Sequence, residues 1–320
     1  MSPTAITLIL IAAMAHASWN LFSKQAAAAG AVCFIWLFFT VGTVLYAPVT
    51  VIVFVVSRPR LSGLPTVFLV GTAILHIGYA LLLQNGYRLG DLSVVYPIGR
   101  GTGALLAAAA GILLLGERPG PLSTAGILLI VAGVIVIGLP SRSRIAQAPA
   151  TQAPPAQAPA PQAPAPRSLD AQAPPAQAPP AVIGIAFALL TGVFIAAYTV
   201  WDKYAVATLQ IPPVIEDWAA TLGVAVALAP VALRDRTRLA TVWRTYRPQV
   251  LGAAVLSPLA YILVLTALRF TAISVAAPCR EVSVLFGVLL GRRMLGEGNQ
   301  ARRLAAAAAI VVGIISVAIG

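Results

Sequence analysis

The sequence predicts an all-α integral membrane protein with ten transmembrane helices, arranged as two inverted repeats of five helices each. The first observation is composition: 59% of the 320 residues are hydrophobic and only 9% are charged, whereas a soluble domain has about 25% charged residues. The second is that uncharged runs of about 20 residues, the length that crosses a bilayer, recur along the chain. The third is that the two halves of the sequence repeat each other in order and spacing.

Each apolar run is expected to be a helix. The hydrocarbon core of a bilayer offers no water, and only a helix satisfies its backbone polar groups within one segment. The alternation of side chains that a membrane β-barrel needs is absent from these runs. The expected helices cover residues 4–24, 32–56, 66–87, 92–116, 122–140, 181–202, 212–233, 250–268, 273–291 and 304–320.

The charge and cysteine content argue against several classes of protein. The formal net charge is +12, but nearly all the arginines lie in short loops beside the apolar runs. There they set orientation and contact lipid headgroups, so no nucleic-acid binding is expected. Cys33 and Cys279 lie within expected helices and are interpreted as buried small side chains, not as a disulfide. Residues 1–4 contain no basic residue, which argues against a cleavable signal peptide.

A segment rich in proline, alanine and glutamine divides the chain. Residues 140–180 contain 12 of the 25 prolines, and Gln-Ala-Pro recurs there with a five-residue period. This composition cannot form a packed core, so an extended, disordered linker is expected. It is interpreted as a spacer, with a docking site for a partner as the alternative. The expected organisation is a first five-helix repeat over 1–139, the linker over 140–180 and a second five-helix repeat over 181–320.

The two halves are interpreted as a duplication. Segments align in the same order, HASWNLFSKQA (16–26) with IAAYTVWDKYA (195–205), YRLGDLSVVYPIGR (87–100) with LRFTAISVAAPCR (268–280), and LLLGE (113–117) with RMLGE (293–297). A unit of five spans begins on one side of the membrane and ends on the other, so its copy begins from the opposite face. Inverted repeats of this kind occur in many secondary transporters, with the substrate site near the midplane between the halves.

A polar stripe runs along the expected first helix. His16, Asn20 and Lys24 are four residues apart and share one face, with Trp19 on an adjoining row. An ionisable group is costly in hydrocarbon, so the stripe is expected to face the protein interior or a wet cavity. For Trp19 and Lys24, anchoring the helix end at the membrane surface is the alternative. His16, Trp19 and Asn20 are therefore candidate substrate-binding residues.

The fourth and ninth expected helices carry the strongest signal for a site. Pro97 and Pro278 lie inside otherwise helical runs, and each is expected to break its helix because proline cannot donate to the carbonyl four residues back. Arg100 follows the first break, and Arg280 and Glu281 follow the second, at a depth where charge is costly. One interpretation is that Arg100 or Arg280 binds an anionic group of the substrate. The alternative is that Arg280 and Glu281 pair with neighbouring side chains in a structural role. Glu281 and the histidine of the first helix are the candidates for titration during coupling.

Other polar and aromatic residues would complete a cavity. Each by itself is more often a membrane-surface anchor or a satisfied interhelical hydrogen bond than a substrate contact. Together they predict a cavity with aromatic walls and a few polar groups. The substrate-binding candidates among them are Tyr79, Tyr96, Tyr198 and Tyr261, and the other candidates are His76, Asn85, Trp201, Glu216 and Asp217.

The sequence carries no motif of an enzyme, a metal site or a cofactor site. HExxH, GxSxG and GxxxxGK[ST] are absent, and neither His16 nor His76 has a second histidine or cysteine at metal-ligand spacing. Without a nucleotide-binding loop, ATP-driven pumping by this chain alone is excluded. Transport is then coupled to an ion gradient or passive.

These features together resemble one family. The five-plus-five spans, HASWN in the first span, the proline, arginine and LLLGE of the fourth, and their echo in the ninth resemble the EamA-type transporters of the drug/metabolite transporter superfamily. The resemblance covers nearly everything except the linker. It implies a ten-helix carrier in the cytoplasmic (inner) membrane of a bacterium, moving amino acids, metabolites or toxic compounds, often outward and often proton-linked. It also implies a structural or helix-capping role for Glu117 and Glu297.

The loop charges and the resemblance disagree on orientation. The loops on the side of the termini carry five basic residues, and those on the other side carry fourteen. The positive-inside rule therefore places the termini outside the cytoplasm, whereas the resemblance implies cytoplasmic termini. The charge count favours the first orientation.

The expected function is secondary active transport, in the direction of export, of small polar or amphipathic metabolites by alternating access, with proton coupling. The expected partners are a small-molecule substrate and the lipid bilayer, with no nucleic acid, no metal and no cofactor, in a monomer or homodimer. The alternative is a non-transporting membrane sensor or scaffold that acts through the proline-rich linker.

Overall fold

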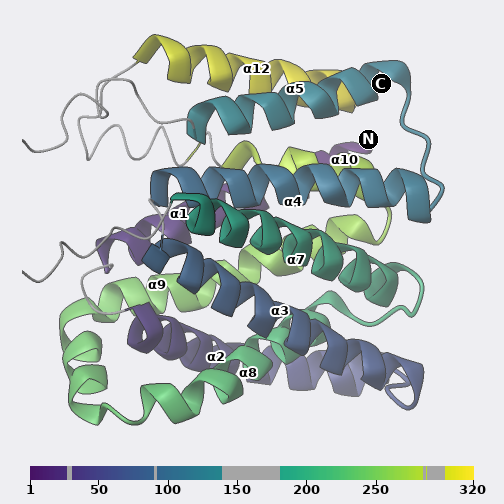
Figure 1. Ribbon diagram of the computed structural model, residues 1–320. Coiled ribbons are helices and arrows are strands. Elements are labelled where there is room, and N and C mark those ends of the chain that lie inside the picture. Colours follow the sequence, from purple (N-terminus) through teal and green to yellow (C-terminus); the bar gives the residue numbers. More distant parts are fainter. Residues whose placement is uncertain (27–30, 90–91, 139–180, 284–285, 287–299) are drawn as a thin grey trace, which may run out of the picture.

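In the computed structural model of the protein, residues 1–26, 31–89, 92–138, 181–283, 286 and 300–320 are described. The regular structure of these residues is helical throughout (Figure 1). The helices are α1 (Pro3–Gln25), α2 (Ala31–Ser57), α3 (Leu64–Leu89), α4 (Leu92–Leu114), α5 (Pro121–Gly138), α7 (Ala181–Ala207), α8 (Pro213–Ala232), α9 (Arg236–Leu268), α10 (Ile273–Arg280) and α12 (Gln300–Ile319).

The outer surface of this bundle is suited to lipid. Large apolar side chains are exposed on it, such as Val56 at 77% and Leu113 at 79% of their area. A soluble protein rarely exposes contiguous apolar surface of this kind. Among the described residues, six helices are long and apolar enough to cross a membrane, and Ile98–Leu114, Pro121–Val136 and Ala305–Ile319 are shorter apolar helices. The predicted helical membrane protein is thus confirmed as a class.

The chain ends lie together at one end of the bundle (Figure 1). The amino group of Met1 donates to the carbonyl oxygen of Ala318 at 3.4 Å. α1 starts at this end, whereas α7, its counterpart in the sequence alignment, starts at the other end. The predicted linker 140–180 and Glu297 lie outside the described residues.

The contacts between helices fall into pairs. α1 packs on α9 as α7 packs on α3, and α2 packs on α9 as α8 packs on α3. Two further contacts, α2 with α8 and α5 with α12, join each helix to its own counterpart. Exchanging the two halves therefore leaves these contacts unchanged.

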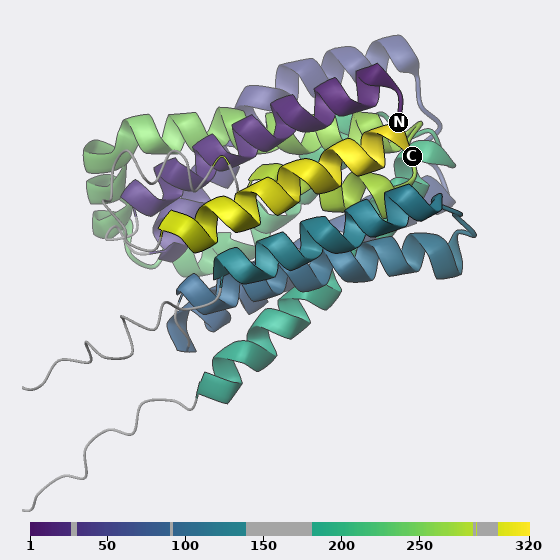
Figure 2. The same ribbon diagram turned by 90° about the horizontal axis from the view of Figure 1, so that it is seen from above.

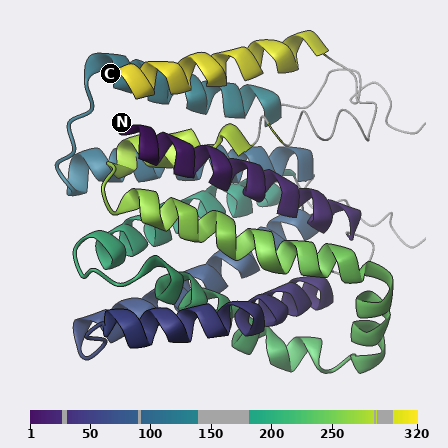
Figure 3. The ribbon, with the colours of Figure 1, turned by 180° about the vertical axis from the view of Figure 1, so that it is seen from behind.

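The eighth helix begins earlier than the sequence predicts. α9 starts at Arg236 instead of residue 250, and Asp235 caps it by accepting a hydrogen bond from the backbone N–H of Arg238 at 2.9 Å. The helix is kinked at Tyr246, where φ is −118° and ψ is 23°, because Pro248 cannot continue the hydrogen-bonding pattern. The arm before the kink carries three exposed arginines, so it was not predicted from the apolar runs. Figure 3 shows the chain turning at this kink.

The two expected helix breaks differ. α10 ends at Arg280, two residues after Pro278, as a break predicts. α4, in contrast, runs from Leu92 to Leu114 without interruption, so the expected break at Pro97 is not present. Pro97 is the sixth residue of α4, where its missing N–H removes a single bond near the helix start.

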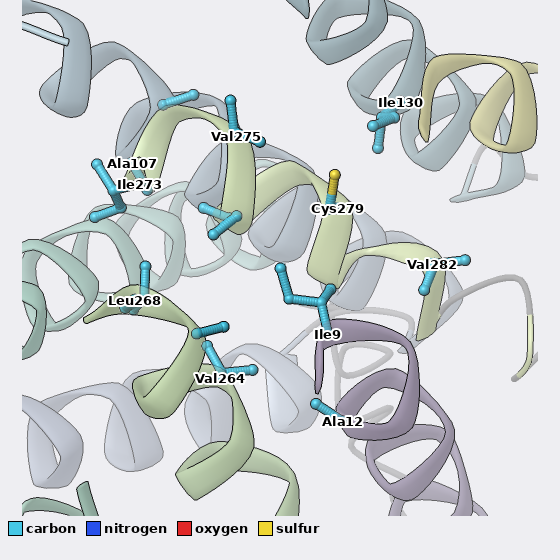
Figure 4. Close-up of a cluster of buried hydrophobic side chains, with 14 of the residues drawn as sticks. Ile9, Ala12, Ala107, Ile130, Val264, Leu268, Ile273, Val275, Cys279 and Val282 are labelled. Carbon is cyan, nitrogen blue, oxygen red and sulfur yellow. The ribbon is translucent and has the colours of Figure 1, made fainter. Parts of the chain in front are cut away.

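Small side chains let the helices pack closely. The main apolar core joins α1, α4, α9 and α10 (Figure 4), and Cys279 is one of its buried, unpaired side chains. α5 and α12 lie side by side (Figure 2), and a Cβ on Gly126 would lie 2.5 Å from the carbonyl oxygen of Gly313 and 2.8 Å from Val317. Contact at this distance requires glycine, as at many membrane helix interfaces.

We expect Gly126→Ala to lower the stability of the folded protein by about 1–3 kcal/mol, because the new methyl group must push two backbones apart. Gly120→Ala is the matched control, since its Cβ would meet its nearest neighbour at 3.4 Å. Thermal unfolding in detergent compares the two. Equal melting temperatures for both variants would contradict the tight α5–α12 contact.

Candidate functional site

A buried ion pair joins the two halves of the chain. The Nε atom of Arg100, on α4, donates to Oε2 of Glu281 at 2.9 Å, and the two residues are 4% and 1% exposed. Glu281 directly follows α10 and is its C-cap. Nη2 of Arg100 lies 3.5 Å from the hydroxyl oxygen of Ser283. Two charges at this burial are tolerated only because each neutralises the other.

His16 extends this pair onto α1. Its Nε2 lies 3.1 Å from Nη1 of Arg100, and its Nδ1 lies 3.2 Å from Nε1 of Trp19. Both neighbours can only donate, whereas a neutral imidazole has one acceptor nitrogen and a protonated imidazole has none. The arrangement therefore favours a neutral ring that accepts from Arg100 or from Trp19, one at a time.

Arg280, the last residue of α10, lies beside this pair. Its Nε is 3.9 Å from Oε1 of Glu281, and its charge also acts on His16, His76 and Tyr261. Only 5% of its area is exposed, and its Nε has no hydrogen-bond partner among the described residues. A buried guanidinium with an unused donor can bind an anionic oxygen.

The second cluster is aromatic and comes from α3, α7 and α9. The ring of His76 lies 4.3 Å from that of Tyr198 and 5.4 Å from that of Tyr261, centre to centre. Tyr79 and Tyr198 meet edge to face at 5.6 Å. The structure thus brings together the aromatic candidates Tyr79, Tyr198 and Tyr261, with His76 among them.

One buried acid borders the aromatic cluster, and two further acids on α8 are buried. Asp202 on α7 accepts a hydrogen bond from the hydroxyl of Tyr261 at 2.5 Å. Asp202 and Glu216 have no exposed area, and Asp217 has 5%. Sequence reasoning named Glu216 and Asp217 as minor candidates and missed Asp202. In the sequence Asp202 stands between Trp201 and a lysine, where it looks like part of a charged helix end at the membrane surface.

The other candidates make local contacts or lie outside the description. The amide of Asn20 donates to the carbonyl oxygen of His16 at 2.8 Å, within α1. Trp201 donates to the carbonyl oxygen of Phe68 at 2.9 Å, away from both clusters. The side chains of Lys24, Tyr96 and Pro97 are outside the described part of the structure.

Two charged side chains hold the junction between α9 and α10. The carboxylate of Glu117 accepts from the backbone N–H of Ile273 at 2.7 Å and of Ser274 at 2.8 Å, which caps the start of α10. The ammonium of Lys203 donates to the carbonyl oxygens of Leu268 at 2.6 Å and of Thr271 at 2.7 Å. Each charge has the sign that stabilises its helix end. Glu117 therefore has the helix-capping role that was expected of it.

Comparison with known proteins gives three findings. The EamA-like transporter family matches residues 3–139 and again residues 182–319. A multidrug transporter of Pseudomonas aeruginosa is 36% identical over 80 residues, which are 25% of this chain and 70% of that protein. A solved crystal structure superposes with a TM-score of 0.71, covering 100% of this chain and 98% of its own, at 16% identity. At that identity the likeness shows the fold alone.

Removing one member of the buried ion pair should destabilise the protein. We expect Glu281→Ala to lower the free energy of unfolding by about 3–5 kcal/mol, because the Arg100 guanidinium stays buried without its carboxylate. The double variant with Arg100→Leu and Glu281→Leu should recover most of this loss. Denaturant unfolding in detergent measures the stability of both variants. A Glu281→Ala variant as stable as the unmodified protein would show that Arg100 and Glu281 do not form the ion pair.

Proposed function

The chain belongs to the EamA-like transporter family, and from this premise we propose that it is a secondary active transporter of small polar or amphipathic metabolites. It works by alternating access between two inverted five-helix repeats. Membership of the family makes it an integral membrane transporter of the drug/metabolite superfamily. We propose that transport is outward, that the substrates are small polar or amphipathic metabolites, and that the mechanism is alternating access.

Three observations support two inverted repeats over residues 1–139 and 181–320. The family matches each half separately. The helices α1 and α7, which align in sequence, start at opposite ends of the bundle (Figure 1). The contacts of α1 and α2 with α9, of α7 and α8 with α3, and of α2 and α5 with their counterparts are also preserved when the halves are exchanged. A pseudo-two-fold axis in the membrane plane accounts for all three observations.

The ion pair between the halves is the observation that carries the proposal. Arg100 belongs to the first half and Glu281 to the second, and both are buried. A rocking motion of one half against the other would separate them, and a substrate group could then replace one partner. The neutral ring of His16 can accept a hydrogen bond from Arg100 in one tautomer and from Trp19 in the other. This cluster therefore has the properties of a binding site that opens to either side in turn.

Arg280 gives the substrate class. Its unused Nε–H and its place beside the aromatic cluster suit a small molecule with an anionic group and an apolar or aromatic body. The name of the Pseudomonas aeruginosa relative, a multidrug transporter, is compatible with export of such compounds across a bacterial inner membrane. Tyr198 and Tyr261 would contact the apolar part of the substrate, and the arginine would contact its anionic group.

Arg280→Ala should strongly weaken transport. A growth screen of cells that overproduce the protein, in the presence of amino acids, metabolites and toxic compounds, identifies the substrates. For those substrates we expect the variant to lose about ten- to a hundredfold in apparent affinity, the effect of one charged hydrogen bond. Arg269→Ala, which changes an arginine bonded to exposed Gln210 at 2.7 Å, is the matched control. Full resistance in Arg280→Ala at equal membrane abundance would reject its role in binding.

Deleting residues 145–178 separates the carrier from the sensor or scaffold alternative. Residues 145–178 lie outside both matches to the family, so we expect transport of the screened compounds to be unchanged within about twofold, given that linker length has only a weak energetic effect. The measurement is the same growth assay at matched abundance. Loss of activity in the deletion variant would instead favour a scaffold that acts through this segment.

A further inference from the structure

α7 and α8 bury two carboxyl groups that the ion pair around Arg100 does not use. Asp202 is near the end of α7 and Glu216 is in the first turn of α8, and neither has any exposed area. The two carboxyls are close enough to interact electrostatically with each other. A buried pair of acids this close needs a physical explanation, because two like charges in a low-dielectric interior repel strongly.

The hydrogen bonds of the pair are incomplete. One oxygen of Asp202 accepts a hydrogen bond from the Tyr261 hydroxyl. The other oxygen of Asp202 and both oxygens of Glu216 find no donor among the described residues. Since a carboxylate can only accept, two carboxylates can be joined only by a proton that one of them carries.

The asymmetry of the donors says which acid carries the proton. Asp202 receives a hydrogen bond from Tyr261, and this bond favours its charged form. Glu216 receives none from the described residues, so its charged form has no comparable support. A protonated Glu216 that donates to Asp202 gives each carboxyl a hydrogen-bond partner and leaves one negative charge. The positive end of the helix dipole at the start of α8 favours a negative charge there.

The groups around the pair are compatible with this state. They are His76 and Tyr79 on α3, Tyr198 on α7, Asp217 on α8, Tyr261 on α9, Arg280 on α10 and, more distantly, Tyr46 on α2. Nδ1 of His76 lies 2.9 Å from the carbonyl oxygen of Thr72, so Nδ1 carries the hydrogen. No group of three acidic, histidine or cysteine side chains in the described residues is arranged to hold a metal ion.

We propose that Asp202 and Glu216 form a proton-binding site, with one proton shared between the two carboxyls and carried by Glu216, and that this site is the coupling site of the carrier. The second part rests on the proposed transport function; the first does not. A proton taken from water on one side would neutralise one charge of the pair and would be released to water on the other side. The sequence prediction that Glu281 or His16 titrates is the competing assignment, and both of those groups are engaged with Arg100.

Infrared spectroscopy of the full-length protein in lipid nanodiscs tests this site without any substrate. The C=O stretch of a protonated carboxyl is separate from the bands of carboxylates. At neutral pH we expect such a band in the unmodified protein, its loss in Glu216→Gln, and its retention in Glu281→Gln. If Glu216→Gln does not fold, Asp202→Asn gives a second readout. The band should move to higher frequency there, because an amide oxygen accepts more weakly than a carboxylate.

Each other outcome overturns the proposal. A band lost in Glu281→Gln and kept in Glu216→Gln places the proton beside Arg100. Absence of a protonated-carboxyl band in the unmodified protein means that both acids are ionised. Loss of the band when sodium chloride replaces choline chloride indicates a metal-ion site. Gel filtration and thermal unfolding verify that each variant is folded. None of these outcomes affects the transport proposal, which the growth screen tests separately.

Discussion

The cost of burying charge in a membrane bundle is the constraint on which the rest of this structure depends. Arg100 and Glu281 are almost fully buried, and each is acceptable there only because the other is within 2.9 Å. Since the two residues come from different halves of the chain, this requirement holds the halves in register. It also makes their relative position sensitive to any group that can replace one partner.

The same constraint organises the surroundings of the pair. α10 is only eight residues long, and its position is fixed from outside by Glu117 at its start and by Lys203 at the end of α9. This short helix presents Arg280 toward both the ion pair and the aromatic cluster. The Arg100–Glu281 ion pair and the buried acids around Asp202 are therefore both close to Arg280. This arrangement suits a carrier that couples the binding of an anionic group to the binding of a proton.

Most of the helices could be predicted because apolar length is a local property. The expected segments agree with the ends of α1, α2, α3 and α5 within two residues. The prediction was wrong where local charge or proline obscured the pattern. The basic arm of α9 before Tyr246 looks like a loop, and Pro97 leaves α4 helical because a proline near a helix start removes only one hydrogen bond.

The sequence by itself determined the class of protein, the positions of most spans and the presence of costly side chains such as His16, Arg100, Arg280 and Glu281, because burial cost depends on residue type and neighbouring apolar length. Only the tertiary structure decided which of these side chains meet. The partner of Arg100 lies 181 positions away along the chain, and Asp202 and Glu216 become neighbours only when α7 packs near α8. Contacts between helices depend on how each helix is rotated about its axis and how far it is shifted along its neighbour. The periodicity within one helix gives no information on either.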